Sequence, residues 1–573
     1  MYPPSPWLTA LAFTIVIVPF AIALIRLLVA SGQHLYLPDD LALIDFHTRR
    51  ALAWKQQLGV FDHFGWNHPG PTYFYLLSVV YRVLGSGAKA MVVGATLINA
   101  LAACACLGVV RRKSTPARTL WAAVCICVLA ALLAGVGPGS ITYSEGALGA
   151  LVSPWNPLVI IFPLLLFIVL CASAIDRSPL SLLGALLVGT FIIQTDLSAL
   201  PLVAVLLAFS AFVWALAGIV RWARARWGAS QALVEPQVPP AVRRHWGPSL
   251  SRVRPWALGA VGIGLFVLMW LPPVIQQRTN HPGNIGLIVR FFRAGHPGQT
   301  LKASVWAVVA GGGTLIAGPA EIMNSVLGGV PYHPAVSVVM SVAVVAIAAT
   351  VIVGGVWQRN RFAAGLGAVC LVGIVSLVMA GTRVVGLYYG YLAIWAITVP
   401  VAALIGIGML RMPARAVVGH GRPISSTRSF RLSLCAVGLV SCVVLMVRVA
   451  MIPPLSAISD PHVGRLESLA SPALQQQGGV FVSDNGAGQP NGLIDTEEFI
   501  GLVNRLDQAG FRPTVNDVWT LEFGPTYLST GHELRRIELD PWTPGSSSIP
   551  GYRGRVGDIA VVVTDAKGRP VGG

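Results

Sequence analysis

Acidic side chains are concentrated in one short stretch of a chain that otherwise has few of them. Asp39, Asp40, Asp45 and Asp62 fall within 24 residues, whereas residues 1–452 contain nine acids in all. A carboxylate can act as a general base, and two adjacent carboxylates push one pKa upward, a repulsion that a shared divalent cation relieves. The Asp39–Asp40 pair is therefore the first candidate for chemistry, with Asp40 as the candidate metal ligand.

A histidine and a run of aromatic residues follow these acids. The stretch GWNHPGPTYFYLLSVVYRVLG predicts a turn at His68–Pro69 that presents the imidazole beside the carboxylates, and then a surface helix opened by Pro71. Its aromatic residues are also typical of an interfacial belt. Asp39 has a structural interpretation too, as the N-cap of a helix whose apolar residues rest on the membrane surface.

The composition indicates a polytopic membrane protein. Of the 573 residues, 55% are hydrophobic and 11% are charged, which disfavours soluble globular classes. The formal charge of +17 does not predict a nucleic-acid partner, because the arginines lie in short clusters between apolar runs. All eight cysteines lie in apolar segments, so neither a disulfide framework nor a zinc ribbon is expected outside the membrane.

About eleven apolar segments are long enough to cross a bilayer. With a cytoplasmic N-terminus, the arginine clusters satisfy the positive-inside rule, and residues 31–90, 137–156, 275–333 and 453–573 lie outside. The Gly-rich stretch 303–318 is expected to be re-entrant or to lie on the membrane surface. The predicted spans are 7–30, 91–110, 118–136, 157–175, 180–195, 197–219, 256–274, 334–356, 362–380, 388–410 and 431–452.

The last 121 residues have a different composition, with 14 of the 23 acids and no long apolar run. GVFVS (479–483), an amphipathic stretch at 493–509, RRIELD (535–540) and DIAVVVTD (558–565) predict strand, helix, strand and strand. We therefore expect an α-helical polytopic domain over 1–452, followed by a soluble, extracytoplasmic α/β domain over 453–573.

The first external loop resembles that of a known family. PDD at 38–40, two juxtamembrane helices within 31–90 and HPGPTYFYLL at 68–77 are similar to GT-C superfamily glycosyltransferases, including lipid A aminoarabinose transferases and protein O-mannosyltransferases. The second acid is Asp where relatives often have Glu, and Pro-Gly-Pro replaces their Pro-Pro. The resemblance covers roughly 1–110 and extends as a likeness of fold to 452.

This resemblance implies an inverting transfer of a sugar from a polyprenyl-phosphate carrier to a hydroxyl group on the outer face of the membrane. Asp39 would be the base. Asp40 would orient Asp39, bind acceptor hydroxyls or hold a divalent cation such as Mg, Mn or Ca. The leaving phosphate needs facing cations. Candidates for phosphate or sugar binding are His68, Arg278, His281, Arg290, Arg293, Lys302, Arg383 and Tyr389, and further cavity candidates are Asp45, Gln194 and Asp196.

Several alternatives stay open. The basic residues at 275–302 are equally typical of contact with anionic lipid headgroups. Arginine outnumbers lysine 35 to 5, which suggests a GC-rich bacterial genome and so favours an actinobacterial arabinofuranosyltransferase of the plasma membrane, with mannose as the next sugar. The acceptor would be a cell-envelope glycan, lipoglycan or protein. A lipid or polysaccharide transporter and a non-catalytic scaffold for cell-wall assembly are the competing functions.

Overall fold

The computed structural model describes residues 6–30, 35–62, 64–134, 147–228, 255–318, 322, 326–327, 333–411, 426–474, 479–485 and 496–571. The proline-rich stretch that starts at residue 235 lies almost wholly outside the described residues, as does the first half of the predicted external loop 137–156.

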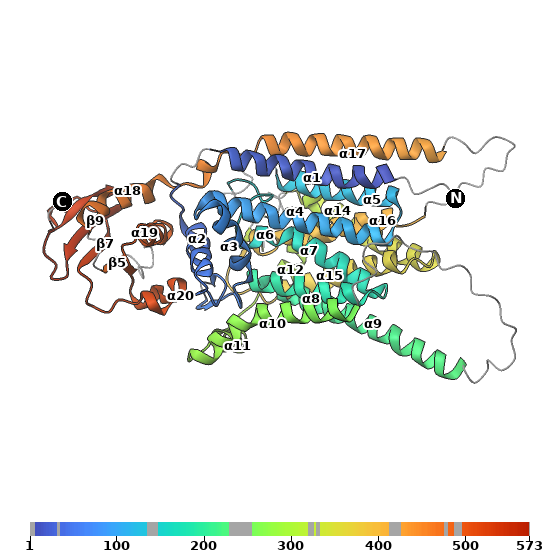
Figure 1. The fold of residues 1–573 in the computed structure, drawn as a ribbon, viewed down its shortest axis with the longest axis horizontal. Coiled ribbons are helices and arrows are strands. Elements are labelled where there is room, and N and C mark those ends of the chain that lie inside the picture. Colours follow the sequence, from blue (N-terminus) through green and yellow to red (C-terminus); the bar gives the residue numbers. More distant parts are fainter. Residues whose placement is uncertain are drawn as a thin grey trace.

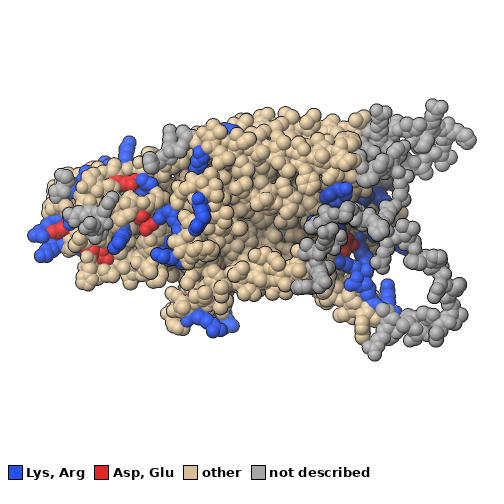
Figure 2. Space-filling model, in the orientation of Figure 1, with Lys and Arg blue, Asp and Glu red and all other residues tan. Residues whose placement is uncertain are grey.

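The described chain contains nine helices that are long and apolar enough to cross a membrane. They lie side by side along the long axis of the molecule, and the C-terminal region sits at one end, here called the domain end (Figure 1). Figure 2 shows a band without charged residues around the middle of this face and charges toward both ends. The protein is thus a multi-pass membrane protein. The helices are α1 (Pro6–Val29), α4 (Ala88–Lys113), α5 (Pro116–Leu133), α6 and α7 (Asn156–Val159 and Ile161–Ile175), α9 (Leu200–Gly228), α10 (Pro255–Thr279), α14 (Pro334–Trp357), α15 (Arg361–Gly381) and α17 (Ser426–Ala450).

Two predicted spans form shorter helices within the bundle. The segment 180–195 is helix α8 (Pro179–Thr195), which packs against α7, α9 and α10. The segment 388–410 is helical only in its second part, η4 (Ile394–Ile397) and α16 (Thr398–Gly408). Its first part instead forms the short strand β4 (Tyr388–Tyr389) and the turn η3 (Gly390–Leu392). The apolar sequence of 388–410 predicts one continuous span, because hydropathy does not distinguish a helix from an apolar chain that lines a cavity.

Helix α12 (Leu301–Ala317) covers the predicted re-entrant stretch. A Cβ on Gly381, the last residue of α15, would lie 2.9 Å from Ser304 near the start of α12. A Cβ on Gly313, toward the end of α12, would lie 2.2 Å from Ser337 in the first turn of α14. Both ends of α12 therefore meet the domain-side ends of neighbouring helices, so α12 does not run the length of the bundle.

Two helices connect the membrane bundle to the C-terminal region. Helix α2 (Asp39–Leu52) packs between α3 (Thr72–Leu84) and the C-terminal helix α19 (Thr496–Gln508). Leu41 and Ile44 of α2 are fully buried. The prediction that Leu41, Ile44, Leu52 and Trp54 rest on the membrane surface is therefore wrong for Leu41 and Ile44, whereas Trp54 is 79% exposed. Helices α3 and α19 both pack against α2, and an amphipathic pattern alone does not distinguish a face buried by protein from one that rests on lipid.

The C-terminal region contains a five-stranded mixed sheet in the order β6-β5-β7-β9-β8. Strand β5 (Val480–Asp484) pairs in parallel with β6 (Pro513–Thr514) and β7 (Arg535–Pro541), and β9 (Ile559–Asp565) pairs antiparallel with β7 and β8 (Tyr552–Val556). Helix α18 (Pro461–Ala470) packs against α19 and the β8–β9 hairpin. The predicted strand, helix, strand and strand are all present. Strands β6 and β8 and helix α18 were not predicted.

Candidate active site

A cavity of about 780 Å³, here called the central cavity, opens between the domain end of the helix bundle and the C-terminal region. Its walls come from α2, the hairpin of β1 (Phe61–Asp62) and β2 (Trp66–Asn67), the loop before α6, the corner between α8 and α9, and the segment between α15 and α16. Residues of the C-terminal region complete the wall. The cavity has the size of a pocket for a small molecule or for the head of a lipid.

Three carboxylates from the opening stretch line this cavity, those of Asp39, Asp40 and Asp62. Asp39 is the first residue of α2 and has φ +38°, a left-handed conformation that is strained for a residue with a side chain. Pro38, and not Asp39, occupies the N-cap position. The N-cap interpretation of Asp39 is therefore wrong, and strain of this kind is concentrated at functional sites.

The carboxylate of Asp40 is held in place by a tryptophan. The indole Nε1 of Trp155 donates a hydrogen bond of 2.7 Å to Oδ2 of Asp40. Burial raises the pKa of Asp40 above the ordinary value of 3.8, while the Trp155 hydrogen bond and the charge of His68 oppose the rise and Asp62 adds to it. A carboxylate with a raised pKa takes a proton from a hydroxyl more readily than an exposed one does.

His68 and Asp196 meet at the corner between α8 and α9. Nδ1 of His68 accepts a hydrogen bond of 3.1 Å from the backbone N–H of Leu197, which assigns the proton of a neutral imidazole to Nε2. Asp196 caps the next turn, because its Oδ1 accepts a hydrogen bond of 2.9 Å from the N–H of Ser198. Both residues line the central cavity, so the predicted turn at His68 places the imidazole in the same cavity as the carboxylates.

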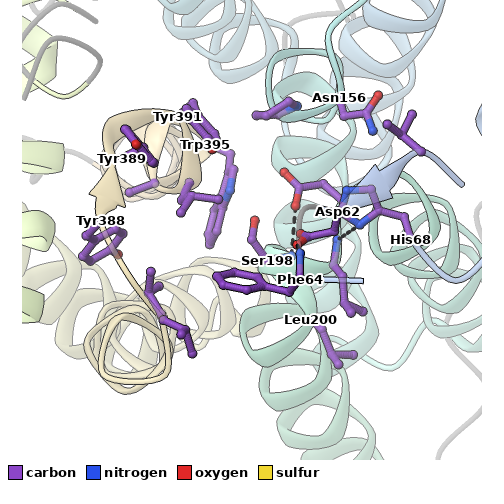
Figure 3. Close-up of a pocket in the computed structure, with 18 of the residues that line it drawn as sticks. Asp62, Phe64, His68, Asn156, Ser198, Leu200, Tyr388, Tyr389, Tyr391 and Trp395 are labelled. Carbon is purple, nitrogen blue, oxygen red and sulfur yellow. Dashed lines mark hydrogen bonds between the residues drawn. The ribbon is translucent and has the colours of Figure 1, made fainter. Parts of the chain in front are cut away.

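The opposite wall is aromatic. Figure 3 shows Asp62, His68 and Asn156 on one side of the cavity, and Tyr388, Tyr389, Tyr391 and Trp395 facing them from the other. The rings of Tyr389 and Tyr391 are stacked at 5.5 Å, and the ring of Trp155 lies 5.0 Å from that of Tyr391. Arg383 lines the same cavity and is the only lysine or arginine among its described lining residues.

Seven buried polar atoms of the lining residues have no hydrogen-bond partner among the residues that the structure describes. Such orphaned groups are rare in proteins, because burying a polar group without a partner costs free energy. A ligand with several hydroxyl groups would satisfy this mixture of donors and acceptors. The seven atoms are Nε1 of Trp66, Trp395 and Trp519, Oδ1 of Asn156, Oδ2 of Asp196, Oγ of Ser198 and Oε2 of Glu522.

The basic residues predicted from the loop 275–302 lie elsewhere. None of Arg278, His281, Arg290, Arg293 and Lys302 lines the central cavity, and all five side chains are exposed. They surround helix α11 (Asn284–Arg293), whose phenylalanines Phe291 and Phe292 do enter the cavity lining. Arg290 and Arg293 line a separate shallow depression on the outer side of α11. Contact with anionic headgroups, the alternative interpretation, suits these exposed positions better than phosphate binding in the cavity.

Asp45 and Gln194, two further cavity candidates, do not line the central cavity. Asp45 is fully buried between α2, α3 and α19, where its carboxylate accepts hydrogen bonds from Tyr81 (2.8 Å) and Gln508 (2.6 Å). Gln194 is also fully buried. It accepts a hydrogen bond of 2.5 Å from Thr72 and donates one of 3.0 Å to the carbonyl of Met269, which ties α8 to α3 and α10. Both residues hold elements together behind the cavity wall.

The glycine of the Pro-Gly-Pro motif, Gly70, packs so closely against Gln194 that there is no room for a Cβ atom. A Cβ on Gly70 would lie 2.3 Å from Cδ of Gln194 and 2.4 Å from its Oε1. We expect Gly70→Ala to displace this side chain and to destabilise the protein by about 1–3 kcal/mol, the usual cost of overpacking. Thermal unfolding in detergent measures the effect. Gly108→Ala is the matched control because open space surrounds that helical glycine, and equal melting temperatures of the two variants would contradict the prediction.

A divalent cation at Asp40 remains a prediction. Within the described chain, three metal-ligating side chains come close enough to share an ion only at Asp460, His462 and Glu498, in the C-terminal region and away from the cavity. The described carboxylates of the cavity do not form such a three-ligand set. An ion at Asp40 would therefore take further ligands from the donor phosphate, and no chemical step below depends on it.

The sequence marks the other lining residues only weakly. From the sequence, Trp155 is either a stacking platform for a sugar or an interfacial residue, which is the commoner case, and Asp62 belongs to the turn before His68. Trp519 and Glu522 lie about 480 residues further along the chain from Asp39, and no local motif marks them. The sequence signal at Trp519 is an aromatic group, with Phe523, Tyr527 and Trp542, that offers part of a carbohydrate platform, although core packing is the commoner role of such residues.

Comparisons with known proteins find a weak similarity to solved structures and none to curated sequences. No protein-family model matches the chain, and no curated protein sequence matches it. The crystal structure of ArnT from Cupriavidus metallidurans bound to undecaprenyl phosphate is similar, with a TM-score of 0.49 and 12% identity over 97% of this chain and 97% of that chain. The apo state of ArnT from the same organism gives a TM-score of 0.41 and 11% identity over 97% and 98%. Identities this low, with both TM-scores below 0.5, do not establish a family or an activity for this chain.

Proposed function

We propose that this protein is a membrane glycosyltransferase that moves a sugar from a polyprenyl-phosphate carrier to a hydroxyl group of a cell-envelope acceptor. The observation that carries the proposal is the composition of the central cavity. It brings together the adjacent acids Asp39 and Asp40, the imidazole of His68 and the guanidinium of Arg383, although these residues are far apart in the sequence. This set contains a base for the acceptor, and a cation and an N–H donor for the leaving phosphate, the groups that sugar transfer from a phosphate requires.

The proposed reaction is a single displacement. The acceptor oxygen attacks the anomeric carbon while the bond from that carbon to the phosphate oxygen breaks, and the configuration inverts. Asp39 takes the proton of the acceptor hydroxyl, and Asp40, held by Trp155, orients the hydroxyl beside it. The phosphate leaves with the electron pair of the broken bond, and Arg383 and Nε2–H of His68 stabilise its charge.

The stacked pair Tyr389 and Tyr391 offers a flat face for the sugar ring or for the first isoprene units of the carrier. We further propose arabinofuranose as the sugar, with mannose next, and a glycan, lipoglycan or protein as the acceptor. The protein would lie in a bacterial plasma membrane with its N-terminus in the cytoplasm and its C-terminal domain outside. In this orientation the cavity lies on the outer side, opposite the arginine clusters that the positive-inside rule assigns to the cytoplasm.

A transfer assay tests the proposal. Purified full-length protein in detergent or nanodiscs is supplied with radiolabelled polyprenyl-phosphate arabinose or polyprenyl-phosphate mannose and a short glycan acceptor. We expect labelled glycan from at least one donor and no product when the acceptor is omitted. Absence of transfer from both donors to glycan and peptide acceptors would contradict the glycosyltransferase assignment, and acceptor-independent uptake of the intact carrier into vesicles would favour a transporter.

A further inference from the structure

The C-terminal region contributes directly to the wall of the central cavity. Ile500 of α19, Trp519 of the turn η7 (Asp517–Trp519) and Glu522 of α20 (Thr520–Phe523) line the same cavity as Asp39 and Asp40. Trp519 and Glu522 are each only 6% exposed. They are therefore buried in the assembled molecule and belong to the cavity, and they are not part of an open surface of a separate domain.

Several contacts hold this part of the C-terminal region against the membrane bundle. The side chain of Asn67 donates a hydrogen bond of 3.1 Å to the carbonyl of Leu521, the residue next to Glu522. On the neighbouring face, Arg49 of α2 forms an ion pair with Asp507 and donates a hydrogen bond of 2.6 Å to Asn504. Trp519 is itself fixed by stacking on Phe499 at 4.6 Å. Preorganised positions of this kind are expected of residues that bind a substrate.

Trp519 and Glu522 offer complementary hydrogen-bonding groups. Nε1 of Trp519 is a donor and Oε2 of Glu522 is an acceptor, and neither has a partner among the described residues. Burial also raises the pKa of Glu522 to about 7, because little solvent reaches this carboxyl to stabilise its ionised form. Leaving both groups without partners costs free energy, and a ligand that forms hydrogen bonds with them recovers this free energy on binding.

We propose that Trp519 and Glu522 form a subsite for the acceptor and that the acceptor is a carbohydrate. One sugar hydroxyl accepts a hydrogen bond from Nε1 of Trp519, and a second hydroxyl donates one to Oε2 of Glu522. A single serine or threonine hydroxyl can also donate and accept, but it offers only one oxygen, whereas a sugar ring presents several hydroxyls to the unpartnered donors and acceptors of the cavity. The acceptor thus lies between the C-terminal region and the carboxylates of α2. This subsite rests on the proposed glycosyltransferase function for its role, but saccharide binding can be measured without transfer.

The test compares Glu522→Ala and Trp519→Phe with matched controls in the full-length protein. Asp517→Ala removes an exposed acid of the same segment that does not line the cavity, and Trp542→Phe makes the same ring exchange elsewhere in the C-terminal region. Binding of an arabinofuranosyl disaccharide, a mannosyl disaccharide and a threonine-containing peptide is followed by saturation-transfer NMR in nanodiscs. Binding of polyprenyl phosphate is measured in parallel.

We expect at least one disaccharide to bind the wild type, with Kd raised at least tenfold in both cavity variants and unchanged in both controls. Polyprenyl-phosphate binding should stay the same in all four. In the transfer assay the KM for the acceptor should rise while the KM for the donor does not, which a general loss of folding would not produce. Wild-type disaccharide affinity in both cavity variants would overturn the subsite, and loss of peptide binding alone would overturn the carbohydrate assignment.

The failure of this inference is distinguishable from the failure of the proposed function. If the wild type transfers sugar and the cavity variants retain the wild-type KM for the acceptor, the subsite is wrong and the glycosyltransferase assignment stands. If no donor supports transfer but disaccharide binding still depends on Glu522 and Trp519, the subsite stands and the enzyme assignment is wrong.

Discussion

Transfer activity falls by roughly 10²- to 10⁴-fold in Asp39→Asn, the range expected for the loss of a general base. Asparagine is the informative replacement because, unlike most residues, it tolerates the left-handed conformation that Asp39 adopts at φ +38°. The variant therefore removes the negative charge with little change in backbone strain. Initial rates with labelled polyprenyl-phosphate sugar, together with the melting temperature, measure the effect.

Asp40→Asn should also reduce the rate, because the substitution removes a charge that is positioned by Trp155. Asp558→Asn is the control. The side chain of Asp558 is 99% exposed and belongs to the C-terminal region, so the activity of the variant should equal that of the wild type. Undiminished transfer in both Asp39→Asn and Asp40→Asn would show that the carboxylate pair does not act in the reaction.

The raised pKa of Asp40 predicts how the transfer rate depends on pH. The carboxylate form is required, so kcat/KM should fall on acidification through the pKa of Asp40, which burial places above the ordinary 3.8. Trp155→Phe removes the hydrogen bond that stabilises the charged form, and it should therefore move this decline to higher pH. A decline at the same pH in Trp155→Phe and the wild type would contradict the role assigned to that hydrogen bond.

The second large effect is expected at Asp45, which joins the membrane bundle to the C-terminal region. Its carboxylate forms an ion pair with Arg49 (3.2 Å) and accepts hydrogen bonds from Tyr81 of α3 and from Asn504 and Gln508 of α19. Asp45→Ala leaves these buried groups without their common acceptor. We expect a loss of about 3 kcal/mol, the lower end for a broken buried ion pair, because Arg49 keeps its contact with Asp507.

Thermal unfolding and hydrogen exchange of α19 measure this loss. Asp176→Ala is the matched control, since it breaks a partly exposed ion pair with Lys113 (2.9 Å) at the other end of the bundle and should cost about 1 kcal/mol or less. Exchange of α19 should accelerate in Asp45→Ala alone. Equal protection of α19 in the two variants would mean that the C-terminal region is held by other contacts.

Several features of this protein followed from the sequence alone. Apolar runs of bilayer length identify the spanning helices, because a chain in lipid must satisfy its own backbone hydrogen bonds. The change in composition after residue 452 separates the strand-forming segments of the C-terminal region from the membrane helices. Asp39, Asp40 and His68 were also selected locally, because acids are scarce before that point and these residues stand within one loop.

Which residues line the cavity depends on the tertiary structure and does not follow from the sequence alone. Asp45 belongs to the same acidic stretch as Asp40, yet Asp45 accepts hydrogen bonds from the C-terminal helix α19 while Asp40 lines the cavity, because they lie on different faces of α2. The basic residues at 275–302 stay outside the cavity, while Arg383 lines it. Trp519 and Glu522 reach the cavity because α19 docks on α2, and this long-range packing has no signature in local residue spacing.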